Sequence, residues 1–399
     1  MLDKKRSVIL LVIIYIGFIS LGLPDGILGV AWSSIRSELH QPVAYAGILS
    51  LILYFCSSVS SFSSGALLRK FSTGKLLMIC GFLTGSALLG FSLSPAFWCM
   101  LLLVIPLGFG QGAIDTGMNY YVARHHTSRD MNWLHCCWGV GACSGPFLVT
   151  MILTHGGSWR WGYAIVGGVQ FILAILFLST LSLWRDSAAT ANSGSAETHS
   201  ANTKPEKDSR FWCCTLTFWL YAGFEVSIGL WVYTFLTTSR GVSNETAGFT
   251  ATAFFAMLTV GRFLIGFIAN RLGNKYQIQC GALLAFVCGI MMAVPGPQAL
   301  TLLAVGLLGF ASAPLYPAMM HAVPERFDHA TAASVIGYQS GAAMIGVMTI
   351  PPAFGFIAAH TTFNLLPYLV ILLTSLIFLA QSKVDGMDQK INHPPVQDV

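Results

Sequence analysis

Three carboxyl groups lie within long apolar stretches of the sequence: Asp25, Asp115 and Glu225. A charged side chain at the centre of a bilayer costs about 2.5–3.5 kcal/mol on insertion scales, so such residues usually face the interior of a helix bundle and have a function. Burial in an apolar medium favours the protonated form of a carboxyl group, which lets the group bind and release a proton. The three residues are therefore predicted to couple the activity of the protein to protons.

Asp115 has amide side chains at helical spacing on both sides. Gln111 precedes it and Asn119 follows it by four residues, and at 3.6 residues per turn the three side chains share one helix face. A stripe of amide, carboxyl and amide can hydrogen-bond a hydroxylated ligand or relay a proton. We therefore expect Gln111 and Asn119 to contact a substrate.

Asp25 lies at an expected helix break, because Pro24 precedes it and Gly26 follows it. Proline removes a backbone donor and glycine weakens a helix. Such a break is tolerated at membrane depth only where protein or a water-filled cavity satisfies the backbone. Asp25 is therefore predicted to face the bundle interior. A hydrogen bond that merely bridges two helices is the alternative role for each of the three acids.

Further side chains in apolar stretches are candidates for the same cavity. His135 can hydrogen-bond a ligand and titrates near neutral pH when unperturbed, and Gln339 follows it by 204 residues. Trp138 and Trp231 adjoin polar positions and could stack on the C–H face of a ligand, although many membrane aromatics are interfacial anchors. Arg262 is expected to pair with groups of an inner gate. A packing role is the alternative for His135, Trp138 and Trp231.

The composition indicates what kind of chain positions these residues. Of 399 residues, 55% are hydrophobic and 9% are charged, whereas a soluble domain carries about 25% charged residues. This excludes a set of soluble domains, a disordered chain and a collagen. The ten cysteines lie in apolar stretches without CxxC spacing and are interpreted as packing residues. We expect no metal, no cofactor and no disulfide framework.

Twelve apolar stretches are long enough to cross a membrane, which takes about 20 residues in a helix. The fold class is therefore an all-α membrane protein with two bundles of six helices. We expect an N-terminal bundle over 1–183, a polar cytoplasmic linker over 184–210, a C-terminal bundle over 211–383 and a cytoplasmic tail over 384–399. The stretches run over 7–31, 45–67, 74–93, 97–122, 132–154, 161–183, 211–236, 247–269, 276–295, 298–321, 333–358 and 363–382.

Basic residues predict the orientation, because Lys and Arg gather in cytoplasmic loops. With the N-terminus inside, 17 of the 21 Lys and Arg residues fall in inside loops, three fall outside, and Arg262 lies in a span. Both termini are therefore expected in the cytoplasm of a multi-pass protein of a bacterial inner membrane. The net charge of +5 lies in short loops, so we expect contact with the lipid bilayer and no nucleic-acid partner.

The two halves carry related motifs. Gly266-Phe-Ile-Ala-Asn270-Arg271-Leu-Gly273-Asn-Lys275 has a weaker counterpart in Gly65-Ala-Leu-Leu-Arg69-Lys70-Phe-Ser72, about 200 residues earlier. Repeated halves with a site between them are a transporter architecture. The later motif resembles the loop signature of the major facilitator superfamily, with Asn270 in place of the usual Asp. We expect Arg69, Lys70, Asn270 and Arg271 to latch an inner gate, and the alternative is that they only provide the positive-inside signal.

Two further motifs, Gly22-Leu-Pro-Asp25-Gly26 and Gly112-Ala-Ile-Asp115-Thr-Gly-Met-Asn119, are similar to those of fucose-permease-like sugar/proton symporters. In that family, acids at these positions are implicated in proton coupling and sugar recognition, which this resemblance implies for Asp25 and Asp115. The fucose permease proper has Glu at the second position. Glu225 has no clear counterpart there and is predicted as a further proton or substrate-hydroxyl site.

These observations favour a monomeric secondary transporter that carries a sugar or similar small hydroxylated solute together with protons, by alternating access. A proton-driven exporter of drugs or metabolites is the first alternative. Gly145-Pro146 resembles the antiporter signature, but Phe147-Leu148-Val149 follows where that signature has glycines. A membrane sensor that binds a ligand without flux is the second alternative. An enzyme is not expected, because no nucleophile–base set, metal cluster or phosphate loop is found.

Overall fold

The computed structural model describes residues 2–126, 128–187, 208–327 and 329–392, and these residues form helices and no strand. The α-helices are α1 (Leu2–Gly22), α2 (Ile27–Glu38), α3 (Tyr45–Lys70), α4 (Thr73–Leu93), α5 (Phe97–His125), α6 (Ser128–Thr154), α7 (Trp159–Ser179), α8 (Ser209–Ser239), α9 (Asn244–Ala293), α10 (Gln298–Ser312), α11 (Leu315–His321), α12 (Val323–Arg326), α13 (His329–His360) and α14 (Leu366–Asn392), with short 3-10 helices η1 (Leu181–Ser187) and η4 (Phe363–Leu365).

The helices of the described ranges account for twelve membrane crossings. Eleven segments are both long and apolar enough to span a bilayer, and α3, with 26 residues, provides the other crossing. Not every crossing is a separate straight helix. The first is broken between α1 and α2, α10 and α11 together make one, and α9 makes two. The predicted fold class is confirmed.

The 50 residues of α9 comprise two helical segments, one for each crossing, that meet at a kink at Gly273. Gly273 makes the turn with φ of 70°, a left-handed conformation that residues with a Cβ adopt at a cost. The turn therefore falls within the Gly266–Lys275 motif, between the two spans where the sequence predicted an interruption.

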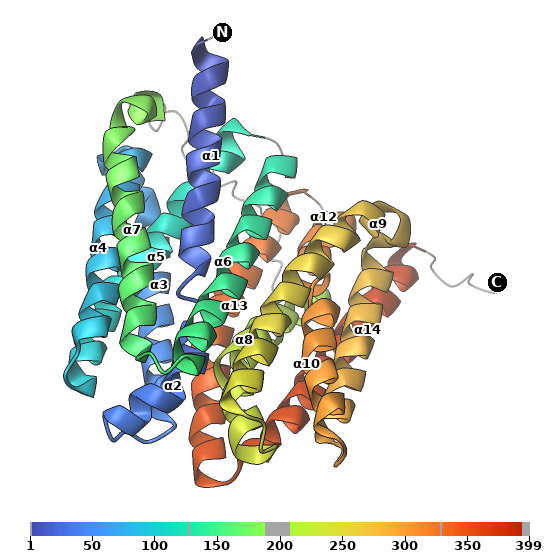
Figure 1. Ribbon diagram of the computed structural model, residues 1–399. Coiled ribbons are helices and arrows are strands. Elements are labelled where there is room, and N and C mark those ends of the chain that lie inside the picture. The colour runs from blue at the N-terminus through green and yellow to red at the C-terminus, as the bar shows by residue number, and fades with distance from the viewer. Residues whose placement is uncertain (1, 127, 188–207, 328, 393–399) are drawn as a thin grey trace, which may run out of the picture.

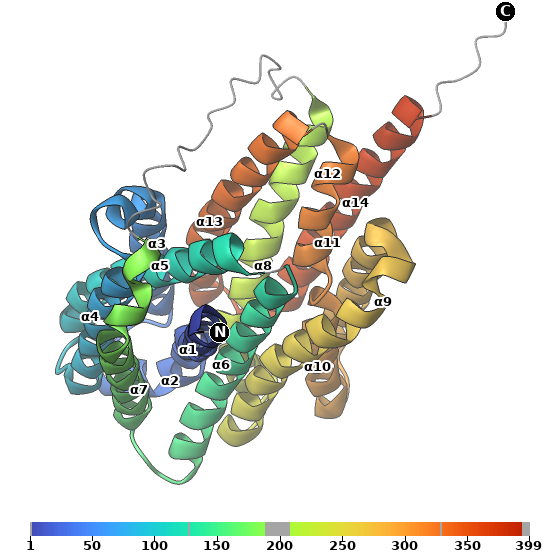
Figure 2. The same ribbon diagram turned by 90° about the horizontal axis from the view of Figure 1, so that it is seen from above.

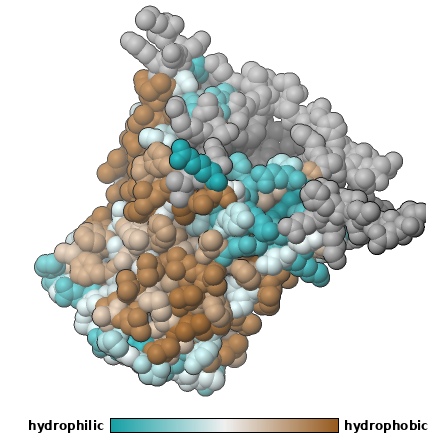
Figure 3. Space-filling model, turned by 90° about the vertical axis from the view of Figure 1, so that its right-hand side faces the viewer, coloured by the Kyte–Doolittle hydropathy of each residue, from teal (hydrophilic) through white to brown (hydrophobic). Residues whose placement is uncertain are grey.

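The helices form two bundles, α1–α7 and α8–α14, which lie side by side (Figures 1 and 2). We call the end at which α1 begins the terminal end, and the opposite end, where α2 finishes, the far end. They lie at the top and the bottom of Figure 1. Figure 3 shows apolar side chains over much of the body and polar ones along the lower rim. Large apolar side chains such as Phe55, Phe267 and Phe356 are exposed, as expected of a surface that faces lipid.

The bundles contact each other mainly toward the far end. Extensive contacts between described residues of the two bundles are made by α6 with α9, α3 with α13 and α2 with α8. At Gly29 of α2 a Cβ would lie 2.3 Å from the carbonyl oxygen of Gly229 of α8, so the two backbones are as close as glycine permits. Nearer the terminal end, Asp115 and Asn119 are half-buried and His135 is exposed. These described side chains are therefore less covered than the residues where α2 meets α8.

Helices α1 and α2 have different main neighbours. α1 packs chiefly on α6 of its own bundle, whereas α2 contacts α8 of the other bundle as well as α6. The four residues Leu23–Gly26 between them form turns, and Gly26 has φ of 76°. The break therefore separates a segment held by one bundle from a segment that touches both.

Candidate functional site

Asp25 lies in the break between α1 and α2 and faces α6. The indole Nε1 of Trp138 on α6 donates a hydrogen bond of 2.9 Å to Oδ2 of Asp25. The two helices approach closely there, since a Cβ on Gly22 would lie 2.3 Å from the carbonyl oxygen of Trp138. The predicted break and the predicted inward orientation of Asp25 both appear in the structure.

Glu225 of α8 forms an ion pair with Arg262 of α9. The distance from Nη2 of Arg262 to Oε2 of Glu225 is 3.4 Å, and the two side chains are 17% and 15% exposed. The hydroxyl of Tyr221 donates a short hydrogen bond to the same carboxylate oxygen and lies 3.1 Å from the carbonyl oxygen of Ser312. Nε of Arg262 is buried without a hydrogen-bond partner among the described residues.

The pair of Asp25 and Trp138 meets the group of Glu225, Arg262 and Tyr221 across the boundary between the bundles. The guanidinium carbon of Arg262 lies 5.6 Å from the centroid of the Trp138 ring, within the range of a cation–π interaction. Asp25 and Trp138 belong to the first bundle, whereas Arg262, Glu225 and Tyr221 belong to the second. We call these five residues the central cluster.

Asp115 and Asn119 lie beside the central cluster on α5. Nδ2 of Asn119 donates to Oδ1 of Asp115 and to its carbonyl oxygen, both at 3.0 Å. Asp115 interacts electrostatically with Asp25. Gln111 is buried on the same helix. The predicted stripe is therefore present, and in this conformation its second amide is hydrogen-bonded to the carboxyl group.

Three tyrosines that we did not select from the sequence border these acids. Tyr54 of α3 interacts electrostatically with Asp25 and Glu225, and Tyr316 of α11 does so with Asp115, Glu225 and Arg262. Tyr221 precedes Glu225 by four residues, and this helical spacing is a signal that the sequence offered. Tyr54 and Tyr316 had no such signal.

The remaining selected residues lie at varying distances from the central cluster. His135 is exposed, meets the edge of Phe18 with ring centroids 5.8 Å apart, and interacts electrostatically with Arg262. Trp231 is buried and donates to the carbonyl oxygen of Pro351. Gln339 is buried, with Nε2 at 3.5 Å from the carbonyl oxygen of Cys214. The structure therefore brings His135 near the cluster and holds Trp231 and Gln339 within the second bundle.

The gate residues are described only in part. The side chains of Arg69, Lys70 and Asn270 lie outside the described residues. Arg271 is exposed, two residues before the turn at Gly273. Their assignment to an inner gate remains a prediction.

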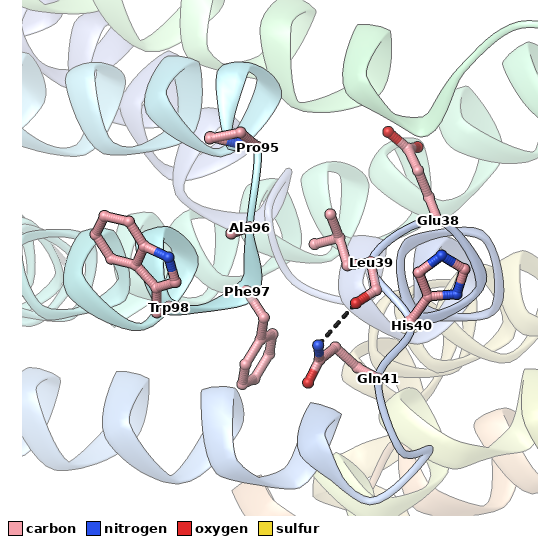
Figure 4. A pocket seen from close by; sticks show the side chains of 8 residues that line it. All are labelled: Glu38, Leu39, His40, Gln41, Pro95, Ala96, Phe97 and Trp98. Atoms are coloured by element: carbon pink, nitrogen blue, oxygen red, sulfur yellow. Dashed lines mark hydrogen bonds between the residues drawn. The ribbon is translucent and has the colours of Figure 1, made fainter.

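A separate pocket opens at the far end of the first bundle. Its volume is about 380 Å³, and it is lined by Glu38–Gln41 and Pro95–Trp98 (Figure 4). Its polar groups are already paired: Glu38 accepts from Trp159 at 2.6 Å and from Arg160 at 2.7 Å, and Nε2 of Gln41 donates to the carbonyl oxygen of Leu39. This arrangement fastens loops together and leaves few free groups for a ligand.

Within the described ranges, no group of three or more His, Cys, Asp and Glu side chains could hold a metal ion. The central cluster and the tyrosines beside it supply carboxyl groups, phenols, an indole and one guanidinium. Such groups can exchange protons and form hydrogen bonds with hydroxyls.

Comparisons with known proteins agree with this architecture. The family model of the Major Facilitator Superfamily matches residues 14–298 and 213–384. The glucose/mannose transporter GlcP of Bacillus subtilis is 25% identical over 286 residues, covering 67% of this chain and 69% of that protein. The sodium-dependent glucose transporter 1 of Danio rerio is 22% identical over 409 residues, covering 90% of this chain and 67% of that protein.

Among solved structures, a bacterial homologue of the human lysosomal transporter Spinster, in an inward-facing and occupied conformation, superposes with a TM-score of 0.75. The sequence identity is 12%, and the match covers 96% of this chain and 97% of that one. It bears on the fold alone. The family match extends over most of the sequence. The chain therefore belongs to the Major Facilitator Superfamily and is a membrane transporter rather than an enzyme.

Proposed function

We propose that the protein is a proton-coupled symporter of a sugar or a similar small hydroxylated solute. The observation that supports this most is the central cluster, in which Asp25 and Glu225 come from different bundles and are linked through Trp138 and Arg262. A site between two bundles is where alternating access exposes a group to one side of the membrane and then to the other.

The balance of charge supports proton coupling. Arg262 is paired with Glu225, and neither Asp25 nor Asp115 forms an ion pair in the described part of the chain. A carboxyl group without a cationic partner is costly to keep charged away from water. Such a carboxyl group is therefore expected to hold a proton while it is buried and to release it when the boundary between the bundles opens to water.

The polar groups also support a neutral, hydroxylated solute. When ionised, the three carboxyl groups outnumber the one guanidinium, which is already paired with Glu225, so an anionic solute would meet net repulsion. The phenols of Tyr54 and Tyr316 and the amide of Gln111 are groups that can hydrogen-bond hydroxyls. The similarity to the glucose/mannose transporter of Bacillus subtilis supports a sugar in particular.

The proposed orientation places the terminal end in the cytoplasm of a bacterial inner membrane. The distribution of Lys and Arg supports it. In this orientation the contacts of α2, α3 and α6 with the second bundle close the outer side. Symport then requires these contacts to separate while the bundles approach each other at the terminal end.

The test is uptake of labelled glucose, mannose, galactose and fucose into proteoliposomes, with and without an inward proton gradient. Asp25→Asn and Asp115→Asn are compared with Glu245→Gln, an exposed acid in the first turn of α9 and thus a matched control. We expect the gradient to drive accumulation of at least one sugar, and both Asn variants to abolish that accumulation while the control retains it. Absence of accumulation in the wild type for every sugar would refute the proposal.

Sodium coupling is the second candidate, because a relative that aligns with 90% of the chain is a sodium-dependent glucose transporter. The same vesicles with a sodium gradient at equal pH on both sides separate the two. Accumulation with sodium alone would replace the proton as the coupling ion.

A further inference from the structure

Trp138 occupies a special position in the central cluster, because it contacts a group from each bundle. Its indole N–H donates to Asp25, and the guanidinium of Arg262 lies over its ring. The residues that follow it fix this position. A Cβ on Gly139 would lie 2.3 Å from Oγ1 of Thr259 on α9, and one on Gly141 would lie 1.9 Å from the carbonyl oxygen of Ile19 on α1. Trp138 is thus held where α6 touches both α1 and α9.

Arg262 is positioned by partners on two sides. Its ion pair with Glu225 comes from its own bundle, and its contact with Trp138 comes from the other bundle. Nε has no partner among the described residues. The placement of the guanidinium therefore depends on where the indole ring lies.

The placement of the ring depends in turn on Asp25. An indole N–H only donates, and a hydrogen bond to an ionised carboxylate is roughly twice as strong as a bond between neutral groups. When Asp25 takes up a proton, the bond from Trp138 weakens and the ring loses its main polar restraint.

We infer that Trp138 is a positioning residue that couples the proton occupancy of Asp25 to the Arg262–Glu225 ion pair across the boundary between the bundles. Protonation of Asp25 releases the indole, and the released indole no longer holds Arg262 in its place beside Glu225. This inference rests on the proposed proton-coupled function. It assigns Trp138 a different part from the stacking on substrate that the sequence suggested, since the guanidinium lies over one face of its ring.

Other titratable or charged groups surround this path and set its pH dependence jointly. On the side of Asp25 they are Tyr54, Asp115 and Glu225. On the side of Arg262 they are Glu225, Tyr221, Tyr316, His135 and Cys136. The test must therefore change the indole N–H and leave all of these groups in place.

Trp138→Phe does this, because phenylalanine keeps an aromatic face for Arg262 and lacks the N–H. Trp138→Leu removes both. The matched control is Trp219→Phe, which removes an indole bond of 3.1 Å to Oγ1 of Thr349, away from the central cluster. In proteoliposomes we would measure exchange of labelled sugar without a gradient, accumulation under a proton gradient, and proton flux with a pH-sensitive dye.

We expect Trp138→Phe to lower gradient-driven accumulation at least tenfold and to lower exchange by a clearly smaller factor. Trp219→Phe should match the wild type in both. Accumulation by Trp138→Phe at the wild-type level would overturn the inference. Loss of exchange and accumulation in equal proportion would overturn it too, because that pattern indicates substrate binding.

A second measurement needs no substrate and keeps the inference separable from the proposed function. Spin labels at His155 and Thr361, exposed residues at the far end of the two bundles, report the distance between the bundles in a cysteine-free variant. We expect a distance that depends on pH in the wild type and does not in Trp138→Phe or Asp25→Asn. If the wild type responds to pH but transports no sugar, the substrate proposal fails alone. If Trp138→Phe responds to pH like the wild type, the inference fails.

Discussion

The ion pair between Glu225 and Arg262 predicts an unequal cost for the loss of either partner. At 3.4 Å and an effective dielectric constant of about 20, two unit charges attract by roughly 5 kcal/mol. Desolvation offsets much of this attraction, so the pair adds little net stability, but removal of one partner from a buried pair costs about 3–5 kcal/mol.

The two partners differ in what they can do when left alone. A glutamate can bind a proton and keep its hydrogen bond from Tyr221, whereas an arginine cannot lose its proton in a protein. Glu225→Gln should therefore destabilise the protein by about 3–5 kcal/mol, and Arg262→Gln by clearly less. The double variant Glu225→Gln/Arg262→Gln should be more stable than Glu225→Gln alone, because no charge remains unpaired.

Denaturant unfolding in detergent at pH 7 measures these differences for the wild type, the two single variants and the double variant. The exposed pair of Arg160 with Glu38, whose side chains are 28% and 44% exposed, serves as a comparison, because its loss should cost less. Equal destabilisation by Glu225→Gln and Arg262→Gln would refute the reasoning, as would a double variant whose loss equals the sum of the two single losses.

Three further predictions concern backbone and helix ends. Gly29→Ala should destabilise the conformation described here by roughly 1–3 kcal/mol through overpacking, because its Cβ would lie 2.3 Å from the carbonyl oxygen of Gly229. Distance measurements between the bundles should then show the far end opening more often. An unchanged distance distribution would contradict this. Gly273→Ala should lower the free energy of unfolding by about 1–2 kcal/mol through left-handed strain, and unchanged thermal unfolding would argue against that strain. Asp208 caps α8 by accepting from the backbone N–H of Arg210 at 2.8 Å, so Asp208→Ala should cost about 1 kcal/mol in denaturant unfolding. Although burial alone would raise the pKa of Asp208, the hydrogen bonds and charge of Arg210 hold that pKa below its usual value. The contribution of Asp208 is therefore complete above the unfolded-state pKa of about 3.9 and is lost as the pH falls through the lower folded-state pKa. A stability difference from Asp208→Ala that persists in stronger acid would show that its charge is not involved.

Much of the fold could be predicted from the sequence, because bilayer thickness and hydropathy constrain helices directly. The break at Asp25 was also predictable, since Pro24 and Gly26 act locally. The position of the turn at Gly273 was predictable too, since polar residues interrupt the apolar stretches 247–269 and 276–295 there.

The site was less predictable, because hydropathy does not give the rotation of each helix about its axis. Trp231 and Trp138 look alike in sequence, yet Trp231 hydrogen-bonds Pro351 inside the second bundle and Trp138 bonds Asp25. The contact of Trp138 with Arg262 joins helices from different bundles, and no local pattern records it. The roles assigned to the site residues stay predictions.

The break between α1 and α2 places Asp25 in a hinge. A rigid helix on one bundle and a short helix that also touches the other bundle can change their mutual angle only by bending at Leu23–Gly26. If the bundles rock, this joint carries part of the rotation, and Asp25 sits inside it. In the proposed proton-coupled cycle, the torque needed to bend this joint would differ between the protonated and ionised states of Asp25, so the hinge and the proton-binding group would be the same piece of chain.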